Sequence, residues 1–66
     1  MNICLNGETI NLDIKTSITD LLNSHGFENK LVAVAINGNF IAKSEHQNYT
    51  LNNGDEIEIV APMQGG

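Results

Sequence analysis

The sequence predicts one small α+β domain, a mixed sheet of about five strands with one main helix packed on one face. Three Asn-Gly dipeptides stand beside runs of alternating apolar and polar residues, a pattern typical of tight turns between short strands. One stretch between them changes to the apolar spacing of a helix. The chain has 66 residues, which leaves room for a single domain with a small core.

The N-terminal segment predicts a hairpin around Asn6-Gly7, with strands over about 1–7 and 8–14. Each of the three Asn-Gly pairs suits a type I′ turn, because both central residues of that turn have positive φ. Apolar residues alternate with polar ones on both sides of the first pair: Ile3, Leu5, Ile10, Leu12 and Ile14. The alternation indicates two strands that each turn one face toward a core.

Residues 17–25 predict a short helix. Ser17 is a suitable N-cap, and Asp20 three residues later gives a pattern close to a capping box. Gly26 can take the left-handed conformation that ends a helix. An apolar stripe with helical spacing follows the cap: Ile18, Leu21 and Leu22. So short a helix is marginal alone, so we expect the stripe to pack on the sheet.

The second half of the chain predicts the remaining strands. "LVAVAING" is apolar at every position before its turn, which indicates a strand that is covered on both faces or central in the sheet, and "NFIA" follows the turn. "SEHQ" (Ser44 to Gln47) matches a capping box and predicts one helical turn. "EIEIVA" alternates and should end before Pro62, which cannot continue a central ladder. We therefore expect a folded domain over 1–61 and a flexible tail over 62–66.

Composition excludes several classes of function. The formal net charge is −5, with eight acidic residues and three lysines. We expect no nucleic-acid partner, because phosphate binding relies on Lys and Arg. No run approaches the roughly 20 apolar residues of a membrane span, and the N-terminus has no signal-peptide pattern. These features predict a cytoplasmic protein with no membrane partner.

Catalytic and metal-binding patterns are missing from the sequence. It contains no Gly-rich phosphate loop and no Cys-x-x-Cys motif. His25 and His46 lie far apart, so we expect no metal site. We expect Cys4, the single cysteine, to be a small apolar residue of a strand. We expect Glu56 and Glu58 to lie on the solvated face of the last strand.

The chain ends on Gly65 and Gly66. Glycine has no Cβ and adopts conformations closed to other residues, so two glycines would fit a narrow channel. Such an end would bring the terminal carboxylate into a partner's active site, where ATP would activate it as an acyl-adenylate. An ordinary frayed terminus is the alternative that these two residues leave open.

Ordered motifs run through the whole chain: "NGE", "SITDLL", "VAVAINGNFI", "LNNGDEIEIV" and "APMQGG". In this order they resemble the ThiS family, the sulfur carrier proteins of thiamin biosynthesis. The family has the ubiquitin-like β-grasp fold, in which the first and last strands lie side by side in the middle of the sheet. That arrangement agrees with the element order predicted above.

The resemblance implies a carrier rather than an enzyme. In the family, the terminal glycine carboxylate, here Gly66, is adenylated by an E1-like adenylating enzyme that uses ATP, so no bound cofactor is expected. Sulfur from a donor downstream of a cysteine desulfurase then converts the adenylate to a thiocarboxylate. This group donates its sulfur to the thiazole ring that thiazole synthase builds. Gly65 matches the family's tail, and Gln64 and Met63 match it less strictly.

Two other functions remain open at this point. The small subunit of molybdopterin synthase shares the fold, the Gly-Gly end and the thiocarboxylate chemistry, although such subunits are usually longer. A ubiquitin-like binding module would share the fold without being activated. A binding module would tolerate an extra residue after Gly66, whereas a carrier would be inactivated by it.

The sheet face away from the helix is the expected docking surface for the activating enzyme. Alternation places Cys4 and Val60 on that face. If the first and last strands are neighbours, these two residues and Met63 would form a small apolar patch. Glu56 and Glu58 share the face and would speed encounter with a basic partner surface.

Overall fold

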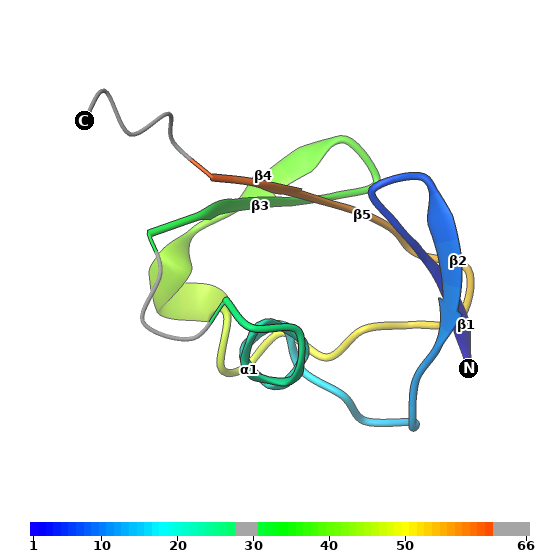
Figure 1. Cartoon of the computed structure of the whole chain (residues 1–66). Coiled ribbons are helices and arrows are strands. Elements are labelled where there is room, and N and C mark those ends of the chain that lie inside the picture. The colour runs from blue at the N-terminus through cyan, green and yellow to red at the C-terminus, as the bar shows by residue number, and fades with distance from the viewer. Residues whose placement is uncertain (28–30, 62–66) are drawn as a thin grey trace.

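Five strands and one α-helix make up the part of the chain that the computed structural model describes, residues 1–27 and 31–61 (Figure 1). In chain order the elements are β1 (Asn2–Leu5), β2 (Glu8–Asn11), α1 (Ile18–Ser24), β3 (Ala33–Ile36), β4 (Asn39–Ile41), the 3-10 helix η1 (Lys43–Glu45) and β5 (Glu56–Val60). The expected tail over 62–66 lies outside the described residues, so the division of the chain at residue 61 stays a prediction.

The strands form one mixed sheet in the order β2-β1-β5-β3-β4. β5 lies in the middle, parallel to β1 on one side and antiparallel to β3 on the other. β2 and β4 are the edges and pair antiparallel with β1 and β3. The predicted fold class is therefore confirmed, including the neighbouring first and last strands that the family resemblance implied.

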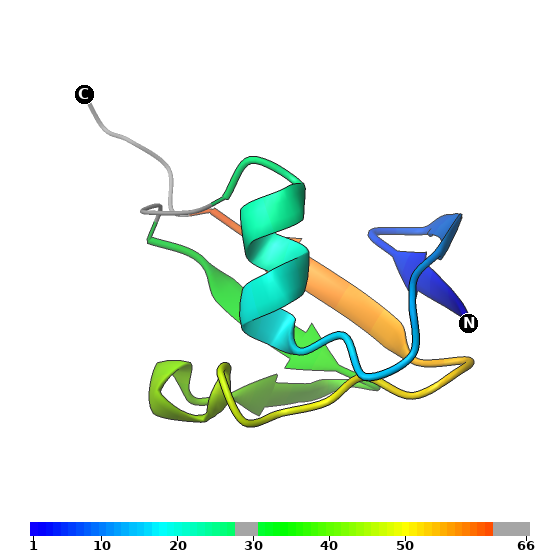
Figure 2. The same ribbon diagram turned by 90° about the horizontal axis from the view of Figure 1, so that it is seen from below.

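The helix begins and ends where the sequence predicts. The Ser17 backbone N–H donates to the Asp20 carboxylate at 3.2 Å, and the Asp20 N–H donates to the Ser17 hydroxyl at 3.0 Å. Both halves of the capping box are thus present. Gly26 follows the helix with φ of +81°. Figure 2 shows α1 crossing one face of the sheet, over β5 and β3.

The core fills the space between α1 and the inner face of the sheet. Its buried members come from the helix, the central strands and one loop: Ile3, Ile18, Leu21, Leu22, Val34, Ile36, Leu51, Ile57 and Ile59. Burying one such side chain fully contributes about 1.5–3 kcal/mol. Ile57 and Ile59 alternate along β5 with exposed Glu56 and Glu58, as the pattern of the last strand predicts.

The first hairpin is shorter than predicted. β2 ends at Asn11, opposite Asn2 in the ladder. The next residue, Leu12, still exchanges backbone hydrogen bonds with Met1 at 2.8 and 2.6 Å. Ile14 has no residue of β1 opposite it and is 74% exposed. The alternation of apolar and polar residues thus continues in the sequence beyond the last residue of β2 that pairs in the sheet.

Two predictions about loops were wrong in part. The helical turn expected around Ser44 forms as η1, but its N-cap is Ala42, which has no side-chain cap, so the expected capping box does not form. Asn53-Gly54 is not a type I′ turn, because only Gly54 has positive φ, +87°. The Asp55 N–H donates to the carbonyl of Asn52 at 3.1 Å, which closes a turn between a loop and β5 and not a hairpin.

Candidate functional site

The sheet face turned away from α1 is the open surface of the fold. Residues directly opposite each other in a ladder share a face, so the register shows which side chains belong here. We call this surface the outer face and define it by Cys4, Ala33, Ala35, Phe40, Glu56, Glu58 and Val60. These residues come from β1, β5, β3 and β4, with β5 at the centre of the sheet, and Thr9 of β2 lies opposite Cys4 on the same face.

Cys4 and Val60 share the outer face but do not adjoin. Cys4 pairs with Glu56 at the beginning of β5, whereas Val60 pairs with Ala33 at its end. Four residues of strand separate the two levels, which is about 13 Å. β1 ends at Leu5 and does not reach the level of Val60. The predicted joint patch of Cys4 and Val60 therefore does not form, and Met63 lies outside the described residues.

The apolar part of the outer face lies toward β4. Val60 is 54% exposed and Phe40 is 74% exposed. Between them, Ala33 pairs with Val60, and buried Ala35 pairs with both Phe40 and Glu58. Three neighbouring strands thus present apolar side chains beside the acidic residues of β5, the composition of a partner surface.

The sequence alone does not indicate Phe40 as a residue of the outer face. Phe40 stands next to Ile41 in "NFIA", and two adjacent apolar residues do not reveal which one faces the core. The register decides, because Ile41 pairs with buried Val34 and so turns inward. Phe40 is therefore directed outward.

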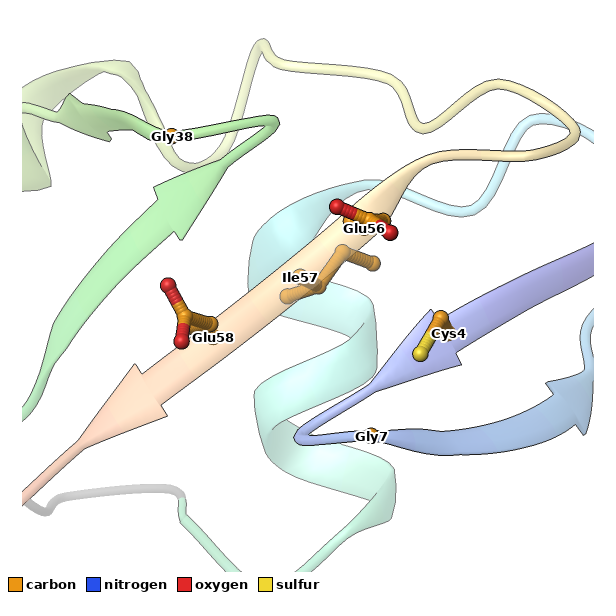
Figure 3. A pocket seen from close by; sticks show the side chains of 6 residues that line it. All are labelled: Cys4, Gly7, Gly38, Glu56, Ile57 and Glu58. Atoms are coloured by element: carbon orange, nitrogen blue, oxygen red, sulfur yellow. The ribbon is translucent and has the colours of Figure 1, made fainter.

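A shallow depression of about 310 Å³ lies on the outer face between the two Asn-Gly hairpin turns. Its lining residues are Cys4, Gly7, Gly38, Glu56, Ile57 and Glu58. In Figure 3 both glutamate side chains stand on the near side of β5, whereas Ile57 points behind the strand toward α1. The depression is open and acidic, so it fits a basic group of a partner protein better than an anionic cofactor.

The two asparagines of the hairpin turns bind the backbone of β5. The Asn6 side-chain oxygen accepts from the Ile59 N–H at 2.9 Å. The Asn37 side-chain oxygen accepts from the Glu56 N–H at 2.9 Å, and its amide nitrogen donates to the Asp55 carboxylate at 3.1 Å. From the sequence, these asparagines are predicted only as turn residues, since nothing local shows which strand a turn side chain will reach.

Each histidine has a ring nitrogen within hydrogen-bond distance of a backbone carbonyl. His46 is 6% exposed, and its Nε2 donates to the carbonyl of Ile41 at 3.1 Å. His25 is exposed at the end of α1, with Nδ1 3.2 Å from the carbonyl of Leu21. Among the described residues no group of three His, Cys, Asp or Glu side chains is placed to hold a metal ion. Across the same residues no helix is long and apolar enough to cross a bilayer.

β5 is the last strand before the C-terminal residues that the family resemblance identifies as reactive. The strand ends at Val60, beside the beginning of β3 and far from the N-terminus (Figure 1). The predicted tail residues Met63, Gln64, Gly65 and Gly66 follow in the sequence and lie outside the described residues. The outer face and the end of β5 are thus the described parts of the candidate site.

A family model described as the ThiS family matches residues 3–66. The chain belongs to the ThiS family. Two solved structures agree with this fold and family. The crystal structure of the thiamine biosynthesis protein ThiS from Geobacter metallireducens matches with a TM-score of 0.82 and 28% identity, over 100% of both chains. A solution structure of a thiamine biosynthesis protein from the same organism gives a TM-score of 0.79 and 28% identity, covering 100% of this chain and 88% of the other.

Two curated relatives connect this ThiS-family chain with thiamin biosynthesis. The sulfur carrier protein ThiS of Thermus thermophilus is 41% identical over 64 residues, which cover 97% of this chain and 98% of that protein. A thiazole synthase of Paramagnetospirillum magneticum is 35% identical over 66 residues, which are 100% of this chain. The match covers only 20% of that thiazole synthase, so most of the larger protein has no counterpart here.

Proposed function

We propose that this chain carries sulfur as a thiocarboxylate on Gly66 and delivers it for thiazole formation. Its family makes it a ThiS sulfur carrier protein of thiamin biosynthesis. The observation that carries the chemical detail is the family match, which extends through Gly65 and Gly66. A carboxylate at Gly66 is the reactive group that such an end provides.

The proposed chemistry needs a partner for every step. A carboxylate oxygen of Gly66 attacks the α-phosphate of ATP, and pyrophosphate leaves. The acyl-adenylate is then attacked at its carbonyl carbon by a persulfide sulfur, and AMP leaves. A second thiol must reduce the resulting S–S bond to free the thiocarboxylate. The chain itself is therefore a substrate of its E1-like activating enzyme and is not the catalyst.

The outer face is the proposed docking surface for that enzyme. Val60 supplies exposed apolar area at the end of β5, and Phe40 supplies more on β4, level with Glu58. Glu56 and Glu58 supply negative charge in the centre of the same surface. Apolar anchors of this kind contribute most of the affinity of an interface, while surrounding charges steer the encounter. We expect a basic, partly apolar surface on the partner.

Thiazole synthase is the proposed sulfur acceptor. The similarity between the entire chain and one part of a thiazole synthase supports this pairing. The proposal predicts that the thiocarboxylated chain transfers its sulfur when thiazole synthase and its other substrates are supplied. Transfer only to a molybdopterin precursor would contradict it.

Intact mass measurement tests the carrier function. The chain is incubated with the activating enzyme, ATP and a sulfide source. Replacement of one oxygen by one sulfur is expected, and a variant with Gly66 deleted should show no such gain. A variant with one residue added after Gly66 should also stay unchanged. An unmodified wild-type chain, with an enzyme that is active on another carrier, would contradict the proposal and favour a binding module.

A further inference from the structure

Asn6 extends the contact between β1 and β5 beyond the end of β1. The two strands pair at Cys4 with Glu56 and at Leu5 with Ile57. The Asn6 N–H then donates to the carbonyl of Ile57 at 2.8 Å. At the next level only a side chain is available: Asn6 Oδ1 accepts from the Ile59 N–H at 2.9 Å, and Nδ2 lies 3.5 Å from the Ile59 carbonyl oxygen. The Asn6 amide thus takes the place of another strand residue.

This contact requires asparagine for a specific reason. Asn6 has φ of +48° and Gly7 has φ of +86°, so the backbone turns away from β5 at this point. Asparagine tolerates the left-handed conformation, and its short amide offers both an acceptor and a donor. Glycine would tolerate the same φ, but it would leave the N–H and carbonyl of Ile59 without these partners.

The contact between Asn6 and Ile59 is the last one that β5 makes toward the β1 side of the sheet before the strand ends at Val60. Val60, the final residue of the strand, pairs on the other side with Ala33. Six residues, 61–66, then follow to the proposed reactive carboxylate. Fully extended, six residues reach about 21 Å, whereas the eight residues from Ile59 onward reach about 28 Å. Fraying of Ile59 and Val60 would therefore let the carboxylate sample a larger volume and lower its effective concentration at an active site.

We infer that Asn6 is a positioning residue for the activation of Gly66. Its amide holds Ile59 in the sheet, so that β5 stays paired through its last residue, Val60. The contact thereby keeps Ile59 and Val60 from moving together with the proposed reactive carboxylate. The inference rests on the proposed function, because it assigns Asn6 a part in presenting the carboxylate.

Asn37 provides a matched control. It occupies the equivalent position of the other Asn-Gly hairpin turn, with φ of +51°. Its amide binds Glu56 and Asp55 at the beginning of β5, away from the proposed reactive end. Asn6→Gly and Asn37→Gly keep the positive φ available in each turn and remove only the side-chain contacts. The two variants thus release opposite ends of the same strand.

The experiment compares the wild-type chain with both variants in two measurements. Amide hydrogen exchange at Ile59 and Val60 should become roughly tenfold faster in Asn6→Gly, the change expected for one lost hydrogen bond. It should stay near the wild-type rate in Asn37→Gly. In steady-state adenylation of the full chain, Asn6→Gly should lower kcat roughly two- to tenfold with KM unchanged, because the outer face still docks. Asn37→Gly should leave kcat at the wild-type value, because the reactive end of β5 stays held.

Each alternative outcome is distinguishable. Equal kcat values for Asn6→Gly and the wild type would overturn the positioning role, as would an equal loss in both variants. A higher KM with unchanged kcat would assign Asn6 to docking and also overturn it. An unaltered exchange rate at Ile59 would show that the amide does not hold the strand end. Absence of adenylation in the wild type itself would instead remove the proposed function, and the inference with it.

Discussion

Replacing Val60 by aspartate tests whether the outer face docks the activating enzyme. Val60 is 54% exposed, so the fold loses little buried area when it is replaced. Strand propensities span about 1 kcal/mol. Repulsion from Glu58, about 7 Å away on the same face, adds about 0.6 kcal/mol in water. A domain of 66 residues has a free energy of unfolding of about 3–10 kcal/mol, so Val60→Asp should remain folded.

The effect on docking should be larger than the effect on folding. Full burial of a valine contributes about 1.5–3 kcal/mol, and roughly half of that remains available to a partner, or about 1 kcal/mol. An unpaired carboxylate in the interface costs about 2 kcal/mol more. The sum of about 3 kcal/mol corresponds to a rise in KM for the carrier of roughly 100-fold.

The assay is steady-state adenylation, with pyrophosphate release as the readout and circular dichroism to verify folding. Ile14→Asp is the matched control, because Ile14 is 74% exposed and lies between β2 and α1, away from the outer face. We expect its KM to stay within about twofold of the wild type, as for most surface substitutions. A folded Val60→Asp with wild-type KM, or equal losses in both variants, would refute the docking surface.

Three further predictions concern stability and association. Ile57→Ala empties a position that is 1% exposed, so urea denaturation should show a loss of about 2–5 kcal/mol; a loss below about 1 kcal/mol would contradict the described core. Ser17→Ala removes half of the capping box and should lower the free energy of unfolding by about 1 kcal/mol, whereas an unchanged midpoint would show that the cap is dispensable. Replacing Glu56 and Glu58 by glutamine should lower the association rate with the activating enzyme at low salt and flatten its salt dependence, as stopped-flow mixing would measure; identical salt profiles would exclude steering by these residues.

Local patterns were sufficient for the helix and for the two hairpins. The capping box of α1 involves only Ser17 and Asp20, three residues apart, so the sequence contains both partners. The turns at Asn6-Gly7 and Asn37-Gly38 likewise depend on residues that are adjacent in the chain. Local patterns do not show where a strand loses its partner. Ile14 continues the alternation of the sequence but has no residue of β1 opposite it, and it is exposed.

The candidate site was predictable only in part for the same reason. Alternation placed Cys4, Val60 and the two glutamates of β5 on one face, and the ladder agrees with that placement. It gave no register between β1 and β5, and the register separates Cys4 from Val60. The direction of Phe40 and the reach of the Asn6 amide depend on long-range pairing as well.

The number and kind of elements, the sign of the net charge and the family resemblance could all be predicted from the sequence. These properties follow from residue types and short spacings, which need no knowledge of distant contacts. The residues that share a level on the sheet, and the side chains that bind the end of β5, became clear only from the folded chain. Strand pairing sets them, because a shift of register by one residue would turn each side chain to the opposite face.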